Sequence, residues 1–163
     1  MTAFEQVYET TIVALYRYAF GFLGNRSDAE DAVSESCLHV FRRYGKRTDA
    51  AELKALLFAA TRNAAIDRLR KKRPLPLLHD CAAREEDPET QDMRELLSDL
   101  PSDERELISL KYMSELSFRE IGEFTGINEH TVQSRIYVIL DKMRLLYVEN
   151  DKGDRLPLES KNA

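Results

Sequence analysis

Apolar residues recur at three- and four-residue steps along much of the chain, which is the spacing of one face of an α-helix. The first such stretch covers residues 3–23 and is interrupted at Gly24. The second begins at Ser27, where the sequence Ser-Asp-Ala-Glu has the form of a capping box, and continues to Tyr44. Because no sustained alternation of apolar and polar residues occurs, the pattern predicts an all-α protein.

A third helix is predicted from the N-cap residue Asp49 to Lys72, and Pro74 ends it because proline lacks an amide hydrogen. The residues that follow are acidic and have no regular apolar period. The sequence therefore predicts a first helical domain over residues 1–73 and an acidic linker over residues 74–95.

The second domain is organised around Ser117–Tyr137, which has the pattern of two helices and a tight turn. Ser117 and Glu120 form a capping box for the first of these helices. Gly126 provides the turn, and Asn128 caps the second helix. Four apolar side chains fall where the two helices must bury each other: Ile121, Ile127, Val132 and Ile136. This order is typical of the helix-turn-helix, whose second helix enters the major groove of DNA, although an ordinary helical hairpin has a similar pattern.

The second domain as a whole is predicted over residues 96–147. A supporting helix begins at Pro101, with acidic residues in its first turn, and the second helix of the helix-turn-helix continues to Tyr147. Residues 148–163 are polar, and we expect them to be disordered.

The distribution of charge matters more here than the net charge of −5, which by itself is unfavourable for binding nucleic acid. Residues 1–73 carry 13 Lys and Arg against 9 Asp and Glu, whereas residues 74–96 carry 2 against 7. Six basic residues and one acidic residue lie within Arg62–Arg73. A basic segment of this kind can bind phosphates even in an acidic protein, although cations also stabilise the carboxyl end of a helix without any ligand.

Composition also bears on several other classes of protein. No apolar run is long enough to cross a membrane, and we expect no signal peptide because no basic segment precedes an apolar one at the N-terminus. The two cysteines, Cys37 and Cys81, indicate a reduced, cytoplasmic protein. His79 and Cys81 are too few to form a metal site, so no metal or other cofactor is expected.

Motifs in both halves follow one order. The first half contains AEDAV at residues 29–33 and LLFAATRNAAIDRLR at residues 56–70, and the second contains LSDLPSDERELISLKY at residues 97–112, followed by SFREIG and TVQSRI. This combination resembles the extracytoplasmic-function (ECF) sigma factors, the smallest members of the bacterial sigma-70 family. The resemblance implies a region 2 bundle of three or four helices and a region 4 helix-turn-helix domain, which together bind core RNA polymerase and promoter DNA. It also implies a non-enzymatic initiation factor and an anti-sigma factor as a further partner.

The resemblance assigns three sets of residues. A docking surface for core polymerase is expected on the second helix, formed by Asp28, Asp31, Glu35, Leu38 and Arg42. A −10 group on the third helix would hold an extruded base and the phosphates of the opened strand, and it comprises Arg62, Asn63, Asp67, Arg68, Arg70, Lys71 and Arg73. A −35 group would face the major groove, and it comprises Asn128, His130, Thr131, Gln133, Ser134, Arg135 and Tyr137.

Some positions depart from the family pattern. Leu56 replaces a frequent aromatic residue, and Ser34 and Cys37 replace a common glutamine and phenylalanine. In the recognition helix, Gln133 and Val138 stand where basic residues are frequent. This helix is therefore only weakly basic, and we expect weak −35 binding by the protein alone, with polymerase providing the effective concentration.

Two other functions remain compatible with parts of the sequence. A sigma-like decoy would sequester an anti-sigma factor without touching promoters, and the acidic net charge favours it, whereas the complete recognition helix does not. A stand-alone helix-turn-helix regulator would use its first domain to sense a ligand, but the first 73 residues show no sign of a pocket. The carboxylates at the start of the second helix suit a helix N-terminus, so they do not indicate an enzyme.

Overall fold

The computed structural model describes residues 1–71 and 94–150, with side chains up to residue 145, and every regular element within them is helical. Most of the expected linker, Arg73 and the tail beyond Asn150 lie outside the described residues. The last helix extends to Asn150, three residues beyond its predicted end. Residues 94–98, at the border of the expected linker, are already helical.

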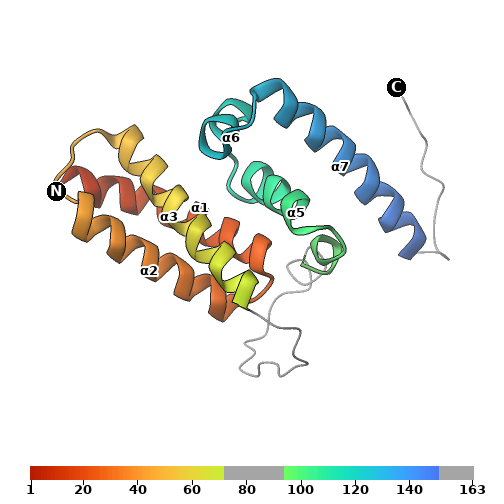
Figure 1. Cartoon of the computed structure of the whole chain (residues 1–163), viewed down its shortest axis with the longest axis horizontal. Coiled ribbons are helices and arrows are strands. Elements are labelled where there is room, and N and C mark those ends of the chain that lie inside the picture. Colours follow the sequence, from red (N-terminus) through yellow and green to blue (C-terminus); the bar gives the residue numbers. More distant parts are fainter. Residues whose placement is uncertain (72–93, 151–163) are drawn as a thin grey trace.

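Three long helices form the first half of the molecule: α1 (Ala3–Leu23), α2 (Arg26–Tyr44) and α3 (Ala50–Lys71). They pack against one another as a bundle, which Figure 1 shows on the left. The bundle has this form because each helix contributes fully buried apolar side chains to a common interior. The largest of these are Leu15, Tyr18, Val40, Leu53 and Leu57.

Side-chain hydrogen bonds cap the first turns of these helices, and one cap differs from the prediction. Thr2 and Glu5 form a capping box at the start of α1, and Asp49 accepts hydrogen bonds from the first amides of α3. The capping box predicted at Ser27 is wrong, because Asn25 is the N-cap of α2 and its side chain accepts the amide of Asp28 at 2.8 Å. The helix can begin one residue after Asn25 because Gly24, with φ 73°, has already reversed the chain.

The second half begins at the short helix over residues 94–98 and contains α5 (Ser102–Ile108), the π-helical turn η1 (Ser109–Met113), α6 (Phe118–Thr125) and α7 (Glu129–Asn150). Fully buried aliphatic side chains hold these elements together: Leu97, Leu110, Ile121, Val132 and Ile136. Figure 1 shows α7 as the outermost helix of this half. The two helices of the helix-turn-helix therefore rest on α5 and η1.

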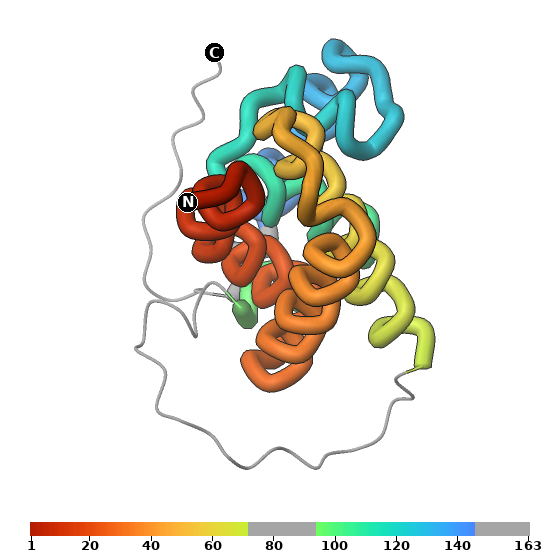
Figure 2. The backbone as a smooth tube through the Cα atoms, turned by 90° about the vertical axis from the view of Figure 1, so that its left-hand side faces the viewer, coloured from red at the N-terminus to blue at the C-terminus, as the bar shows by residue number. Residues whose placement is uncertain are grey.

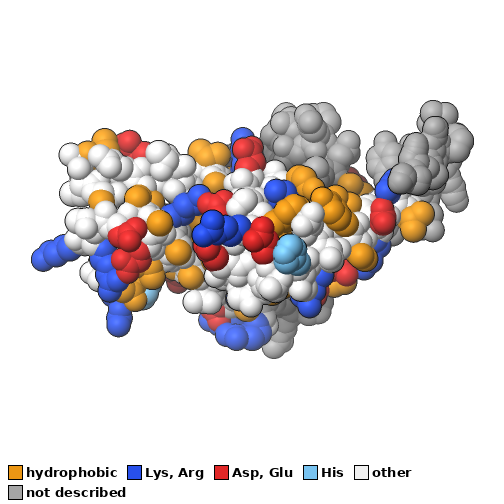
Figure 3. All heavy atoms as spheres, turned by 90° about the horizontal axis from the view of Figure 1, so that it is seen from above, with side chains coloured by type: hydrophobic (Ala, Val, Ile, Leu, Met, Phe, Trp, Pro, Cys, Tyr) orange, Lys and Arg blue, Asp and Glu red, His pale blue; other side chains and the backbone are white. Residues whose placement is uncertain are grey.

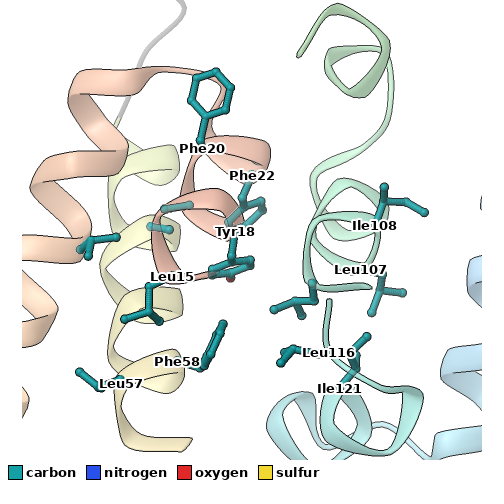
Figure 4. Packing of buried hydrophobic residues seen from close by; sticks show 14 of the residues in the cluster. Leu15, Tyr18, Phe20, Phe22, Leu57, Phe58, Leu107, Ile108, Leu116 and Ile121 are labelled. Atoms are coloured by element: carbon teal, nitrogen blue, oxygen red, sulfur yellow. The ribbon is translucent and has the colours of Figure 1, made fainter. Parts of the chain in front are cut away.

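The two halves also pack on each other, and their buried side chains form one continuous hydrophobic cluster. Figure 4 shows Tyr18 and Phe58 on the side of the first half that faces Leu107 and Leu116. The ring of Phe124 on α6 lies 5.6 Å from that of Phe58 and 6.4 Å from that of Tyr18. Figure 2 shows α6 beside the N-terminal part of α3. The described molecule is thus closed, with the helix-turn-helix half packed against the three-helix bundle.

Candidate nucleic-acid interface

The helix-turn-helix forms as its sequence pattern predicts. Ser117 Oγ accepts the amide of Glu120 at 3.0 Å, and the Glu120 carboxylate accepts the amide of Ser117 at 3.0 Å. The hydrogen bond from the Ser117 amide is the main cause that lowers the pKa of Glu120 below its ordinary value of 4.5. A hydrogen bond from Lys54 lowers this pKa further. A charged Glu120 therefore stabilises the start of α6.

Two glycines with different roles allow the turn that brings α6 and α7 together. Gly126 has φ 81°, the left-handed conformation in which an L-residue with a side chain is strained. A Cβ atom at Gly122 would lie 2.7 Å from the carbonyl oxygen of Ile127, so only glycine fits beneath the turn. Asn128 then caps α7 by accepting the amide of His130 at 2.8 Å.

The −35 group lies on an accessible face of α7. His130, Ser134, Arg135 and Tyr137 are exposed, whereas Thr131 and Gln133 are half-buried. Gln133 donates to the Tyr137 hydroxyl at 3.3 Å, and the Tyr137 ring meets the edge of Phe118 at 6.1 Å. In the closed arrangement His130 and Tyr137 remain exposed, whereas Ser134 and Arg135 line a groove that also includes Arg62 of the first half.

The side chains of the −10 group lie along the carboxyl-terminal half of α3, with the exception of Arg73, which is outside the described residues. Asn63 is exposed, and together with Asp67 and Arg70 it lines an open groove of about 620 Å³ between α2 and α3. His39 and Tyr44 line the α2 side of this groove. Its polar and aromatic lining offers hydrogen-bond and stacking partners to a nucleobase.

Most of the basic residues in this group already have acidic partners. Asp67 pairs with Arg70 at 2.6 Å and with Lys71 at 3.1 Å, and the hydrogen bond from Lys71 is the main cause of the lowered pKa of Asp67. Arg68 pairs with Glu35 of the docking surface at 2.9 Å. Arg62 is half-buried, and its guanidinium pairs with Glu106 of the second half.

On the face of the molecule shown in Figure 3, Lys and Arg side chains are interspersed with Asp and Glu side chains, and no uniform basic patch forms there. Because Arg68, Arg70 and Lys71 are already paired with carboxylates, any phosphate at these residues would have to compete with those partners.

The docking surface on α2 is exposed as expected for Asp31, Glu35 and Arg42. Leu38 is 51% exposed among these charged side chains, while Asp28 at the helix start is half-buried. Phe41, which the apolar period places in the core, is instead 54% exposed, with its ring 5.2 Å from that of Phe4. It extends the apolar part of this surface, and the sequence gives no local signal of its exposure.

The residues that join the two halves were not predicted from the sequence. Glu106 is buried and accepts hydrogen bonds from Tyr18 and Arg62, and burial is the main reason that the pKa of Tyr18 lies well above 10. Arg105 donates to the carbonyl of Phe22 at 2.8 Å, and its pKa is lowered by desolvation. The one available signal was Glu106 itself, an acidic residue next to the apolar pair Leu107–Ile108.

The described residues contain no cluster of three or more His, Cys, Asp or Glu side chains that could hold a metal ion. Cys37 is a free thiol, and burial raises its pKa to about 11. Within the same described part of the chain, no helix is both long and apolar enough to cross a membrane.

These features define a helical protein with a helix-turn-helix module. Residues 7–74 match the family model of sigma-70 region 2, and residues 90–143 match that of sigma-70 region 4. The chain belongs to the ECF group of the sigma-70 family and is an RNA polymerase sigma factor. Membership of this family selects region 4 over an ordinary helical hairpin and a sigma factor over a stand-alone regulator.

Individual relatives agree with this assignment. The chain is 30% identical to RNA polymerase sigma factor SigV of Bacillus subtilis over 142 residues, which cover 83% of this chain and 86% of SigV. It is 27% identical to the ECF RNA polymerase sigma factor SigW of the same organism, with 83% of each chain covered. The solved structure of sigma factor RpoE with the anti-sigma factor NepR from Bartonella quintana has a similar fold, with a TM-score of 0.67, 24% identity, and 93% of this chain and 98% of that chain covered.

Proposed function

We propose that this sigma factor divides promoter recognition between its two halves while α2 holds core RNA polymerase. The −10 group on α3 receives the opened strand, and the −35 group on α7 lies in the major groove of intact duplex upstream. The observation that carries this proposal is the placement of two polar, accessible surfaces, on α3 and on α7, at the positions of regions 2 and 4.

The chemistry of each surface suits its substrate. The amide of Asn63 offers both a donor and an acceptor to a base edge in the groove between α2 and α3. The amide, hydroxyl and imidazole groups of the −35 group can read base edges in the major groove. Neither surface requires a reaction by the protein, and the proposed site of action is the cytoplasm, where polymerase and promoters are found.

An anti-sigma factor is proposed as the regulatory partner. The support is the fold shared with RpoE, which was solved in complex with the anti-sigma factor NepR. The exposed apolar residues Leu38 and Phe41 on α2 give either this partner or polymerase an apolar contact.

The test is in vitro transcription with core polymerase on a set of genomic promoter fragments. We expect start-site-specific transcripts that require this protein, and their alignment defines the −10 and −35 sequences. A protein that binds an anti-sigma factor yet directs no transcript from any fragment would instead be a sigma-like decoy.

A further inference from the structure

Glu106 of α5 is a buried carboxylate whose hydrogen-bond partners lie on the other half of the molecule. Its side chain is 8% exposed. The Tyr18 hydroxyl of α1 donates to it at 2.8 Å, and Arg62 Nε of α3 donates to the same oxygen at 2.5 Å. Arg62 Nη2 lies 3.4 Å from the second carboxylate oxygen. One acidic side chain therefore links α5 to both α1 and α3.

This contact occupies a group that the proposed function gives to DNA. The Arg62 guanidinium directs two nitrogen atoms at Glu106, and only 35% of its side chain is exposed. A DNA phosphate would have to compete with a carboxylate that is already held in place by Tyr18. Because the Glu106 carboxylate is buried, leaving it without Arg62 costs free energy, so the exchange occurs only if the site opens or the new partner binds more strongly.

Several weaker contacts close the same interface. Ser114 donates to the carbonyl of Ala14 at 2.6 Å, and Lys54 pairs with Glu120 at 3.1 Å. A Cβ atom at Gly21 would lie 2.5 Å from the Met113 sulfur, so α1 and η1 approach as closely as a glycine allows. Glu106 is thus the buried charged centre of an extended contact rather than an isolated ion pair.

We propose that Glu106 acts as an autoinhibitory latch, which holds α5 against α1 and α3 in the free protein and keeps Arg62 from DNA phosphate until the two halves separate. The second part of this inference rests on the proposed role of Arg62 in −10 binding, whereas the first does not. Arg62 cannot bind a DNA phosphate and the Glu106 carboxylate at the same time. DNA binding and separation of the two halves therefore favour each other.

The neighbouring acidic residue provides a matched control. Glu104 lies on the same helix and pairs with Lys142 of α7 at 2.7 and 2.8 Å, within the second half. Glu104→Ala and Glu106→Ala remove the same charge from α5, but only the second change breaks a contact between the halves.

The first experiment measures the separation of the halves in the full chain. Spin labels are attached at Ser34→Cys on α2 and Leu145→Cys on α7, two exposed positions, after Cys37 and Cys81 are replaced by alanine and serine. Pulsed electron paramagnetic resonance should give one short distance between the two labels in the parent chain and in Glu104→Ala. Glu106→Ala should raise the longer-distance population by roughly tenfold, because truncation leaves Arg62 and Tyr18 unpaired in the closed form only. An unchanged distance distribution in Glu106→Ala would overturn the latch. A second variant, Tyr18→Phe, should also shift the distribution toward longer distances.

The second experiment measures binding of a random-sequence single-stranded DNA oligonucleotide at low salt. Glu106→Ala should bind roughly tenfold more tightly than Glu104→Ala, since the guanidinium becomes available to phosphate. Adding Arg62→Ala to Glu106→Ala should abolish this gain. A gain that persists without Arg62 would overturn its masking by Glu106, even if the distance measurement supports the latch. Transcription with core polymerase tests the proposed function separately, because the label distances do not depend on promoter activity.

Discussion

Asn63 is an exposed amide beside a groove lined by polar and aromatic side chains, and nothing in the packing of α3 requires an asparagine there. Asn63→Ala should therefore leave the bundle stable but impair promoter opening, because the extruded base loses its hydrogen bonds. A loss of about 1–3 kcal/mol, or roughly ten- to a hundredfold in open complexes, is expected for one base contact of this kind. Permanganate footprinting of the opened strand measures it, beside a pull-down of core polymerase. Equal loss in both assays would contradict a role confined to the base.

Gly122 and Gly126 are required in the helix-turn-helix for different reasons. Gly122→Ala should reduce the free energy of unfolding by about 1–3 kcal/mol, because its methyl group meets the carbonyl of Ile127 and forces α6 from α7. Gly126→Ala should reduce it by about 1–2 kcal/mol through backbone strain alone, since no atom lies within 4 Å of a Cβ there.

Chemical denaturation of the full chain measures both effects. Gly126→Asn should recover much of the stability, because asparagine tolerates the left-handed conformation, whereas Gly122→Ser should not recover it. Recovery by serine at position 122 would show that the turn has more room than the structure allows.

At single residues, the sequence was informative where the cause is local. The capping box at Ser117 and the turn at Gly126 depend on neighbours within a few positions, and both were predicted. The cap of α2 was misplaced because Asn25 and Ser27 are both good N-caps, and only the reversal at Gly24 decides between them. The exposure of Phe41 and the pairing of Arg62 were not predicted, because each depends on which distant element lies nearby.

The outward face of α2 is an element-scale feature, since charged side chains one helical turn apart surround Leu38. Asp31→Arg combined with Glu35→Arg should weaken association with core polymerase at least tenfold, because it reverses the charge of this face. Surface plasmon resonance with immobilised core enzyme measures the affinity. Circular dichroism should show unchanged helix content, and retained affinity would move the docking surface to another element.

Protonation of Glu120 should weaken α6 at low pH. Its pKa is lower in the folded protein than its ordinary value of 4.5, so its contribution is complete above pH 4.5 and is lost as pH falls through the folded pKa. Glu120→Gln should reduce stability at pH 7 and flatten the acid limb of the profile. The free energy of unfolding between pH 6 and pH 3 tests this, with Glu123→Gln on the same helix as the control. Identical acid limbs in the two variants would mean that Glu120 carries no such linkage.

Whole elements were largely predictable because apolar period, caps and helix-breaking residues are all encoded within a single stretch. The bounds of α1 agree with the predicted range, and those of α3 differ only slightly. The π-helical turn η1 was not predicted, because its hydrogen bonds depend on close packing against α1 at Gly21 rather than on the sequence Ser109–Met113 alone.

For the whole molecule, two helical domains followed from the sequence but their closed packing did not. Tyr18 and Glu106 are separated by 88 residues, and no local pattern links a tyrosine on one amphipathic helix to a glutamate on another. The partly accessible −35 group and the partly masked −10 group are consequences of this packing. Together they suggest that duplex recognition is available before strand binding.

The free protein should nevertheless bind −35 duplex weakly. Arg135 is the one basic residue among the −35 group, and Glu129 lies at the start of the same helix, so few counterions are released on binding. Fluorescence anisotropy is measured with a −35 duplex taken from a promoter that the transcription experiment identifies. It should show a Kd above roughly 1 μM that changes little with salt concentration. Core polymerase should restore tight binding because it holds both halves on one promoter at an effective concentration near the millimolar range.

Gln133→Arg tests the electrostatic basis of this expectation. It adds a cation on the half-buried flank of the recognition face and should steepen the salt dependence of duplex binding by about one counterion. Ser34→Arg, an exposed position on α2, adds the same charge away from α7 and should leave that slope unchanged. Nanomolar binding by the unmodified free chain, or equal slopes for the two variants, would mean that −35 affinity does not depend on the weakly basic helix. In that case promoter selection would precede polymerase binding rather than depend on it.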